Sequence, residues 1–261
     1  MAVLTLLVKA RGAGQLKFVD DLLKAEFAEL DVEPKVLGAP VNRWVQVSLS
    51  GEDEVMAANY INKEMGTCPI NTKKIETPQA LKGYITKVDY AKNELTVDIG
   101  VFEPKIALAI IPLSALQTQL AGGKKLDLKK IAEAFGLLEN MPLTVKLLDL
   151  AGKDTEERLQ AELSASQVEK FRLWQLSLLD RLIVLGAASG DVDAVLERTR
   201  LNRDVVDTER LGLFEYALTC KLGTDAAGLI PRMGRYMRNA VFVVFNPRRV
   251  SELIGETPLA L

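Results

Sequence analysis

The sequence contains no histidine, which limits the chemistry that the chain can perform by itself. Histidine is the commonest general base near neutral pH and the commonest zinc ligand in proteins. Ser-His, Cys-His and His-metal mechanisms are therefore excluded. Cys68 and Cys220 are too few for a disulfide framework or a thiolate metal cage, and we expect both to be reduced. We predict no catalytic residue, no metal site and no cofactor.

Two short stretches could still bind or activate a substrate. The "RGAG" of residues 11–14 follows a predicted strand and precedes a helix, as a dinucleotide-binding loop does, but Lys17 stands where its third glycine belongs. Cys220 precedes Lys221 and a glycine turn. Strand alternation, however, places Cys220 on the same face as Tyr216 and Leu218. We interpret the first stretch as a plain turn and Cys220 as a buried side chain.

Positive charge is concentrated in residues 218–250, where six basic residues accompany one acidic residue, a net charge of +5. Pro231 suits the first turn of a helix, which would leave backbone N–H groups free to attract an anion. The three-residue spacing from Arg232 would hold three arginines within an arc of about 120° on that helix. We predict that this basic edge binds phosphate through Lys221, Arg232, Arg235, Arg238, Arg248 and Arg249. The alternative is that the arginines pair with acidic residues of 191–215.

The elements that would position these residues fall into three segments. Residues 1–79 read as strand, helix, two strands, helix and an optional strand over 68–75, which is the ferredoxin-like α+β order. Residues 80–164 read as five strands with a helix over 126–137 between the third and fourth, the order of an OB-fold barrel. Residues 165–261 read as a connecting helix and a second ferredoxin-like βαββαβ domain. A linker is expected at 76–80.

The central segment resembles the RNA-binding OB domain first described in the largest protein of the small ribosomal subunit. The resemblance lies in "KGYITKVDY", "LTVDIGV", "AIIPLSAL", "LTVKLLDL" and "ERLQAELS". It implies RNA binding, although Leu95, Val97 and Ile99 stand where members of that type carry aromatic side chains. Asp98, on the strand face expected to meet the ligand, would oppose phosphate. The residues that this resemblance leaves for RNA binding are Lys87, Tyr90, Lys92, Phe102, Lys105 and Lys153.

Most of the chain also resembles a family restricted to archaea and described only as a domain of unknown function. The stretches that carry this resemblance are "VDIGVFEPKIALAIIPLSAL", "LLDRLIVLGA" and "ERLGLFEYALTCKLGTDAAGLIPRMG". The resemblance implies a cytoplasmic archaeal protein and supplies no activity.

The leading hypothesis is a non-enzymatic adaptor that binds RNA, ribosomal RNA or the ribosome itself, through the OB loops and the C-terminal basic edge. The second is a scaffold for protein contacts or dimerisation without nucleic-acid binding, and the third is a small-molecule enzyme that does not use histidine. No apolar run is long enough to cross a membrane, so we expect a cytoplasmic protein. The sequence leaves the oligomeric state open.

Overall fold

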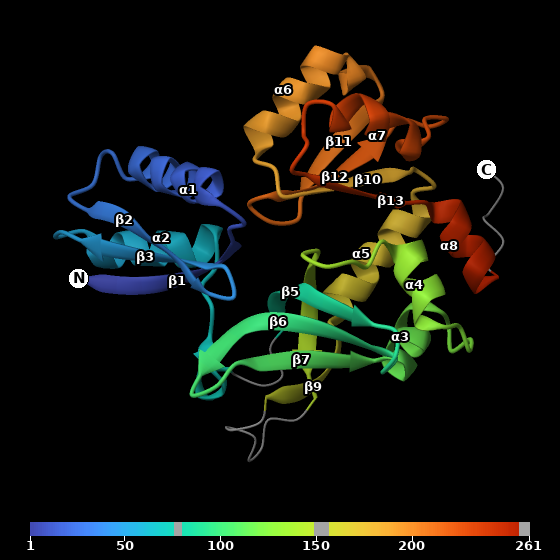
Figure 1. Ribbon diagram of the computed structural model, residues 1–261, viewed down its shortest axis with the longest axis horizontal. Coiled ribbons are helices and arrows are strands. Elements are labelled where there is room, and N and C mark those ends of the chain that lie inside the picture. Colours follow the sequence, from blue (N-terminus) through green and yellow to red (C-terminus); the bar gives the residue numbers. More distant parts are fainter. Residues whose placement is uncertain (76–79, 149–156, 256–261) are drawn as a thin grey trace. The chain divides into compact units, whose positions relative to one another are not determined.

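The computed structural model of the protein describes residues 1–75, 80–148 and 157–255 (Figure 1). Over these residues it is a mixed α+β structure with three sheets. The described residues form two compact units. The first consists of Met1–Ile75 and Ile99–Ala107, and the second of the remaining described residues. The expected linker at 76–80 lies mostly outside the described residues.

The first unit contains a three-stranded antiparallel sheet in the order β1-β3-β2. Helix α1 packs against β2, and α2 packs against β1 and β3. In α1 the buried residues Val19 and Leu23 follow the helical spacing expected for one apolar face. The elements are β1 (Ala2–Lys9), α1 (Ala13–Glu26), β2 (Glu33–Val41), β3 (Trp44–Ser50) and α2 (Glu54–Glu64).

The optional fourth strand of this sheet does not form as expected. After an isolated bridge between Leu6 and Thr67, and a hydrogen bond from the Cys68 N–H to the Thr5 carbonyl, Pro69 has no N–H with which to continue the ladder. The short strand β4 (Ile70–Asn71) instead pairs in parallel with β6, and a 3-10 turn over Thr72–Lys74 follows it.

Five strands, most of whose residues belong to the second unit, pair in a closed ring, β5-β6-β7-β9-β8, with β8 returning to β5 (Figure 1). Two helices, not one, connect its third and fourth strands, because the apolar positions Leu116 and Leu120 bury a short helix before the one expected from the sequence. The elements are β5 (Ala80–Asp89), β6 (Glu94–Glu103), β7 (Ala107–Pro112), α3 (Leu113–Leu120), α4 (Leu128–Phe135), β8 (Pro142–Leu147) and β9 (Arg158–Leu163).

The same unit contains a four-stranded antiparallel sheet in the order β11-β12-β10-β13. Helix α5 leads from the barrel into this sheet (Figure 1). The elements are α5 (Ala165–Leu176), β10 (Arg181–Leu185), α6 (Ser189–Thr199), a 3-10 turn (Leu201–Arg203), β11 (Val205–Arg210), β12 (Glu215–Cys220), α7 (Ala226–Gly234), β13 (Val241–Phe245) and α8 (Pro247–Ile254).

The two central strands of this sheet, β10 and β12, are buried on both faces, and alternate residues of the sheet serve different cores. Leu182, Leu218 and Cys220 belong to the cluster that also contains residues of α6 and α7. Phe245 of β13 instead meets three aromatic rings of α4 and α5, with centroid distances of 5.2–6.3 Å to Phe135, Phe171 and Trp174. The second cluster joins the barrel side of the unit to the sheet.

Helix α7 begins earlier than Pro231, contrary to the expectation from the sequence. Asp225 caps it, with its carboxylate accepting a hydrogen bond from the Ala227 N–H at 3.0 Å, and Pro231 lies inside the helix. A side-chain cap satisfies one of the first N–H groups of a helix and so fixes its start. Met233 and Gly234 therefore do not form an anion-binding helix start. Helix α8, which the sequence pattern did not predict, begins at Pro247.

Candidate nucleic-acid interface

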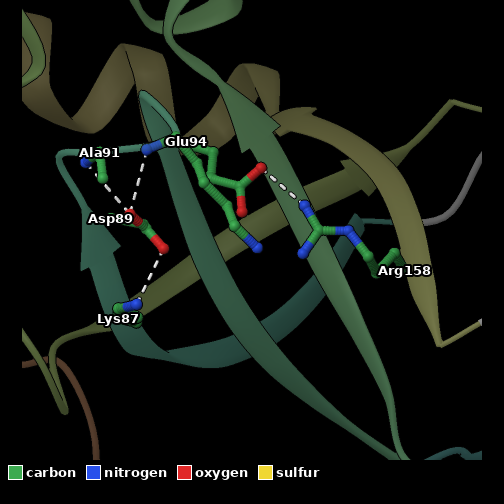
Figure 2. A network of polar contacts seen from close by, with 6 residues as sticks. Lys87, Asp89, Ala91, Glu94 and Arg158 are labelled. Carbon is green, nitrogen blue, oxygen red and sulfur yellow. Dashed lines mark hydrogen bonds and ion pairs between the residues drawn. The ribbon is translucent and has the colours of Figure 1, made fainter.

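The β5–β6 turn carries three of the predicted RNA-binding residues, and the buried carboxylate of Asp89 organises it (Figure 2). Asp89 accepts backbone hydrogen bonds from Ala91 and Lys92, both at 3.1 Å, and pairs with the Lys87 ammonium at 2.8 Å. The hydrogen bond from Lys87 is the main cause that lowers the pKa of Asp89, and it raises the pKa of Lys87 in return. Lys87 is thus an ion-pair partner before any ligand arrives.

A second ion pair lies beside this turn. The Arg158 guanidinium of β9 donates to the Glu94 carboxylate of β6 at 2.6 Å, which raises the pKa of Arg158 (Figure 2). Together the two pairs balance two cations with two carboxylates. The exposed groups that this turn adds are the Tyr90 ring, with 54% of its surface accessible, and the Lys92 side chain.

The remaining residues predicted on the barrel are placed less favourably. Phe102 lies within β6 and is half-buried, whereas Lys105 is exposed. Both belong to the first unit, while Lys87, Tyr90 and Lys92 belong to the second. Lys153 lies outside the described residues. Asp98 is 1% exposed, so its carboxylate is in the interior and not on a ligand-facing surface, contrary to the expectation.

The three arginines around α7 do not share one helix face. Arg232 is in the helix, whereas Arg235 and Arg238 follow it. The Arg232 guanidinium donates to the Thr199 carbonyl and lies 3.8 Å from the Asp204 carboxylate. For Arg232 the structure therefore supports the alternative interpretation, in which the arginine pairs with the segment 191–215.

The other five basic residues of this segment are exposed. Over the described ranges of the chain, no ion pair involves their side chains. They form two groups, because strand β13 separates Arg235 and Arg238 from Arg248 and Arg249, and five strand residues span roughly 15 Å. Arg181 pairs with both Thr219 and Phe245, so Lys221 lies at the same end of the sheet as Arg248.

A cavity that no sequence pattern indicated lies in the second unit between β5, β8, α5 and the end of β11. Its volume is about 170 Å³. Six of its lining residues carry polar groups or a ring N–H: Lys82, Thr144, Gln167, Lys170, Trp174 and Arg210. Gln167, Lys170 and Trp174 are spaced three and four residues apart, so one face of α5 presents all three. The three cations come from distant parts of the sequence, which left no local motif to find.

The cations of this cavity are held unequally. The Glu209 carboxylate accepts from Lys170 at 2.8 Å and from the Trp174 ring N–H at 2.9 Å. The Arg210 guanidinium donates through Nε to the Gly212 carbonyl at 3.3 Å. Burial is the main cause that lowers the pKa of Lys82, with Lys170 and Arg210 lowering it further and Glu215 opposing them.

The three domains of one protein family match consecutive parts of the chain. The DUF2110 N-terminal domain matches residues 8–70, the DUF2110 central domain 75–175, and the DUF2110 C-terminal domain 179–245. The chain belongs to the DUF2110 family. No curated protein matches it.

Among solved structures, this DUF2110 chain is similar to the intact alpha subunit of aIF2 from Pyrococcus abyssi. The sequences are 9% identical with a TM-score of 0.26, and the alignment covers 65% of this chain and 97% of that chain.

The matched DUF2110 domains divide the cations between them. Lys82, Lys87, Lys92 and Lys170 fall in the central domain, whereas Arg210, Lys221 and the arginines around α7 fall in the C-terminal domain. Arg248 and Arg249 follow the matched range. The cavity is thus built from two DUF2110 domains that pack together within one unit.

Cys220 of the DUF2110 C-terminal domain is free and buried, as expected. Burial raises the pKa of its thiol to about 11, with Asp180 and Asp225 adding to the effect, so the thiol stays protonated at neutral pH.

Among the described residues, no group of three or more Cys, Asp or Glu is arranged to hold a metal ion. Within those residues, too, no helix has the length and apolar character needed to span a bilayer.

Proposed function

We propose that the protein is a non-enzymatic RNA-binding adaptor associated with the ribosome or translation, and that it acts in the archaeal cytoplasm. In this proposal the closed five-stranded barrel is an OB-fold domain, and the first and last sheets are ferredoxin-like domains. The strand order β11-β12-β10-β13 supports the assignment of the last domain, because helix α6 follows β10 and helix α7 follows β12, as in a ferredoxin-like βαββαβ unit.

The observation that carries the proposal is the set of exposed cations at the two ends of the C-terminal sheet. Within the part of the chain that the structure describes, the side chains of Arg235, Arg238, Arg248 and Arg249 lack a carboxylate partner. An arginine without an ion-pair partner can exchange its counterion for a phosphate oxygen, and the released ion favours binding. A rigid sheet holding two such groups suits a phosphate backbone that passes both ends.

The barrel contributes less in this proposal. Lys87 is occupied by Asp89, and Glu94 and Asp89 would both repel phosphate. Tyr90 keeps an exposed ring on which one base could stack. We therefore expect affinity to depend mainly on the C-terminal arginines, with the barrel turn adding a single stacking contact.

Ultraviolet crosslinking of the native protein in cells, followed by sequencing of the attached RNA, tests the proposal. We expect enrichment of defined RNA segments over a mock purification, with crosslinked peptides from 235–249 or from the β5–β6 turn. Recovery of no RNA above the mock level would refute RNA binding. A stable complex that survives ribonuclease would then favour the scaffold alternative.

A further inference from the structure

The cavity of the second unit is lined by positively charged side chains, which favour the binding of an anion. Lys82, Lys170 and Arg210 line it, and neither aspartate nor glutamate is among its lining residues. Its volume of about 170 Å³ far exceeds the roughly 10–15 Å³ that one water molecule requires on the same measure. We propose that this cavity is a binding site for a phosphate group.

The nearby carboxylates do not remove the need for an anion. Glu209 is already hydrogen-bonded to Lys170 and Trp174. Glu215 is 3% exposed and accepts from the Tyr84 hydroxyl at 3.2 Å and from the Phe214 N–H at 3.3 Å. Glu215 thus acts on Lys82 only through its charge. In the described residues, the Lys82 ammonium makes no hydrogen bond or ion pair.

The donor chemistry of the lining favours phosphate over a smaller or singly charged anion. Lysine ammonium groups act as compact point charges, and a guanidinium offers a planar fork for two oxygens. With Nε of Arg210 directed to the Gly212 carbonyl, its terminal nitrogens remain for the ligand. Gln167 adds an amide, because its oxygen is held by the Thr144 N–H at 3.1 Å and its NH₂ group is left as a donor.

The site is fixed before any ligand binds. Gln167, Lys170 and Trp174 are spaced along one helix, α5, whose Phe171 and Trp174 rings are packed against Phe245. Lys82 stands on β5, paired in register with Thr144 of β8. Because barrel, helix and sheet contribute to one compact unit, little ordering has to accompany binding. Phosphate binding in this cavity does not require RNA binding, since a free phosphate ester would use the same contacts.

The first test is calorimetric titration of the full chain with inorganic phosphate, against sodium chloride at equal ionic strength, together with thermal unfolding. We expect phosphate to bind and to raise Tm, because a ligand that binds only the native state stabilises it. Lys82→Met should weaken phosphate binding about tenfold or more, the usual cost of losing one hydrogen bond to a charged group. The same variant without phosphate should fold at least as well as the parent, because it no longer buries an unpaired cation.

Lys129→Met is the matched control, since Lys129 lies on α4 with a side chain that is 72% exposed and away from the cavity lining. It should leave phosphate binding unchanged. Equal phosphate affinity in Lys82→Met and the parent, or no phosphate effect beyond that of chloride, would overturn the proposal. A drop in affinity in Lys129→Met as large as that in Lys82→Met would show a non-specific charge effect and would overturn it equally.

The pH dependence provides a second readout. Bound phosphate would raise the lowered pKa of Lys82, so binding takes up a proton when the free site has lost one. A mononucleotide carrying a 5′-phosphate is the ligand for this readout, because the charge of a phosphate monoester, whose second pKa is about 6, stays constant above pH 8. We therefore expect affinity to fall between about pH 8 and 10.5 in the parent more steeply than in Lys82→Met. Parallel pH profiles would contradict the assignment of Lys82.

Two sources of phosphate are separated by competition. A mononucleotide carrying a 5′-phosphate and an oligoribonucleotide without terminal phosphates are each titrated against bound inorganic phosphate. Displacement by the oligoribonucleotide would identify the RNA backbone as the source, and displacement by the mononucleotide alone would identify a small phosphate ester. Arg248→Gln with Arg249→Gln should leave the phosphate measurement unchanged, so failure of the RNA-binding proposal is distinguishable from failure of this one.

Discussion

The arginines of the C-terminal segment that lack an ion-pair partner among the residues that the structure describes are free to bind a phosphate group, whereas Arg232 is not. Arg232 is already bonded to the Thr199 carbonyl and close to Asp204, so its removal costs local contacts. Arg248 and Arg249 are exposed at the start of α8, with no such partners in the described residues. Charge on the second kind of arginine is the charge that a phosphate backbone can use.

Changing Arg248 and Arg249 together to Gln should therefore flatten the slope of log K against log salt for RNA binding. The slope should decrease by about 0.7–0.9 for each phosphate that the variant no longer binds. Filter binding or fluorescence anisotropy across a salt series measures it. Lys129→Gln with Lys130→Gln removes the same charge from α4, where both lysines have carboxylate partners, and should change the slope little. Equal slopes in the arginine variant and the parent would show that these arginines do not bind RNA.

Cys220 is the residue whose role in the fold and lack of reactivity follow from one fact, its burial. With a thiol pKa of about 11, only about one thousandth of the group is thiolate at pH 8. We expect alkylation by iodoacetamide in the native protein to be much slower than in the unfolded chain. Cys220→Ala should lower the free energy of unfolding by roughly 0.5–3 kcal/mol and leave RNA affinity unchanged. Rapid alkylation of native Cys220 at pH 8 would contradict this.

At the scale of single elements, patterns of two and of three to four residues were enough to predict most strands and helices. The alternation of "LFEYALTC" predicted that Cys220 is buried, as it is, and the connecting helix expected after the barrel is α5. The helix start at Pro231 was wrong because proline's fixed φ suits several helical positions, whereas the side chain of Asp225 supplies the hydrogen bond that begins the helix.

The candidate site could be predicted only where its residues are neighbours in sequence. Lys87, Tyr90 and Lys92 share one turn, so their proximity was evident, but the pairing of Lys87 with Asp89 was not. The cavity joins Lys82, Lys170 and Arg210, which the barrel, α5 and β11 bring together. No local sequence pattern predicts that these three residues lie close together, because their proximity depends on how two domains pack.

The cap of α7 provides a test at this scale. Asp225→Ala removes the acceptor for the Ala227 N–H and should lower the free energy of unfolding by about 0.5–2 kcal/mol. Urea unfolding followed by circular dichroism measures it. Asp225→Asn keeps an acceptor at the cap and should recover most of the loss. If Asp225→Ala unfolds at the urea concentration of the parent, the cap contributes nothing and another group fixes the start of α7.

At the scale of the whole second unit, the aromatic cluster decides whether the barrel and the sheet unfold together. Phe135 belongs to α4, Phe171 and Trp174 to α5, and Phe245 to β13, so the cluster ties together elements on both sides of the junction. The Tyr84 hydroxyl of β5 adds a buried hydrogen bond to Glu215 of β12. A phosphate in the neighbouring cavity would strengthen the same junction.

Phe245→Ala should therefore destabilise more than the sheet in which Phe245 lies. Removal of a buried phenylalanine side chain costs about 3–5 kcal/mol, and here the void would open beside Trp174 and Phe135 as well. In a Trp44→Phe background, Trp174 fluorescence reports on this junction, and its urea midpoint should fall together with that of the circular dichroism signal of the unit. Leu173 of α5 is 54% exposed, so Leu173→Ala should leave both urea midpoints nearly unchanged. In the contrary outcome, Phe245→Ala lowers the urea midpoint of the Trp174 fluorescence but leaves the midpoint of the circular dichroism signal at its value in the parent. The barrel would then be stable without the sheet, and the phosphate cavity between them could not be a preformed site.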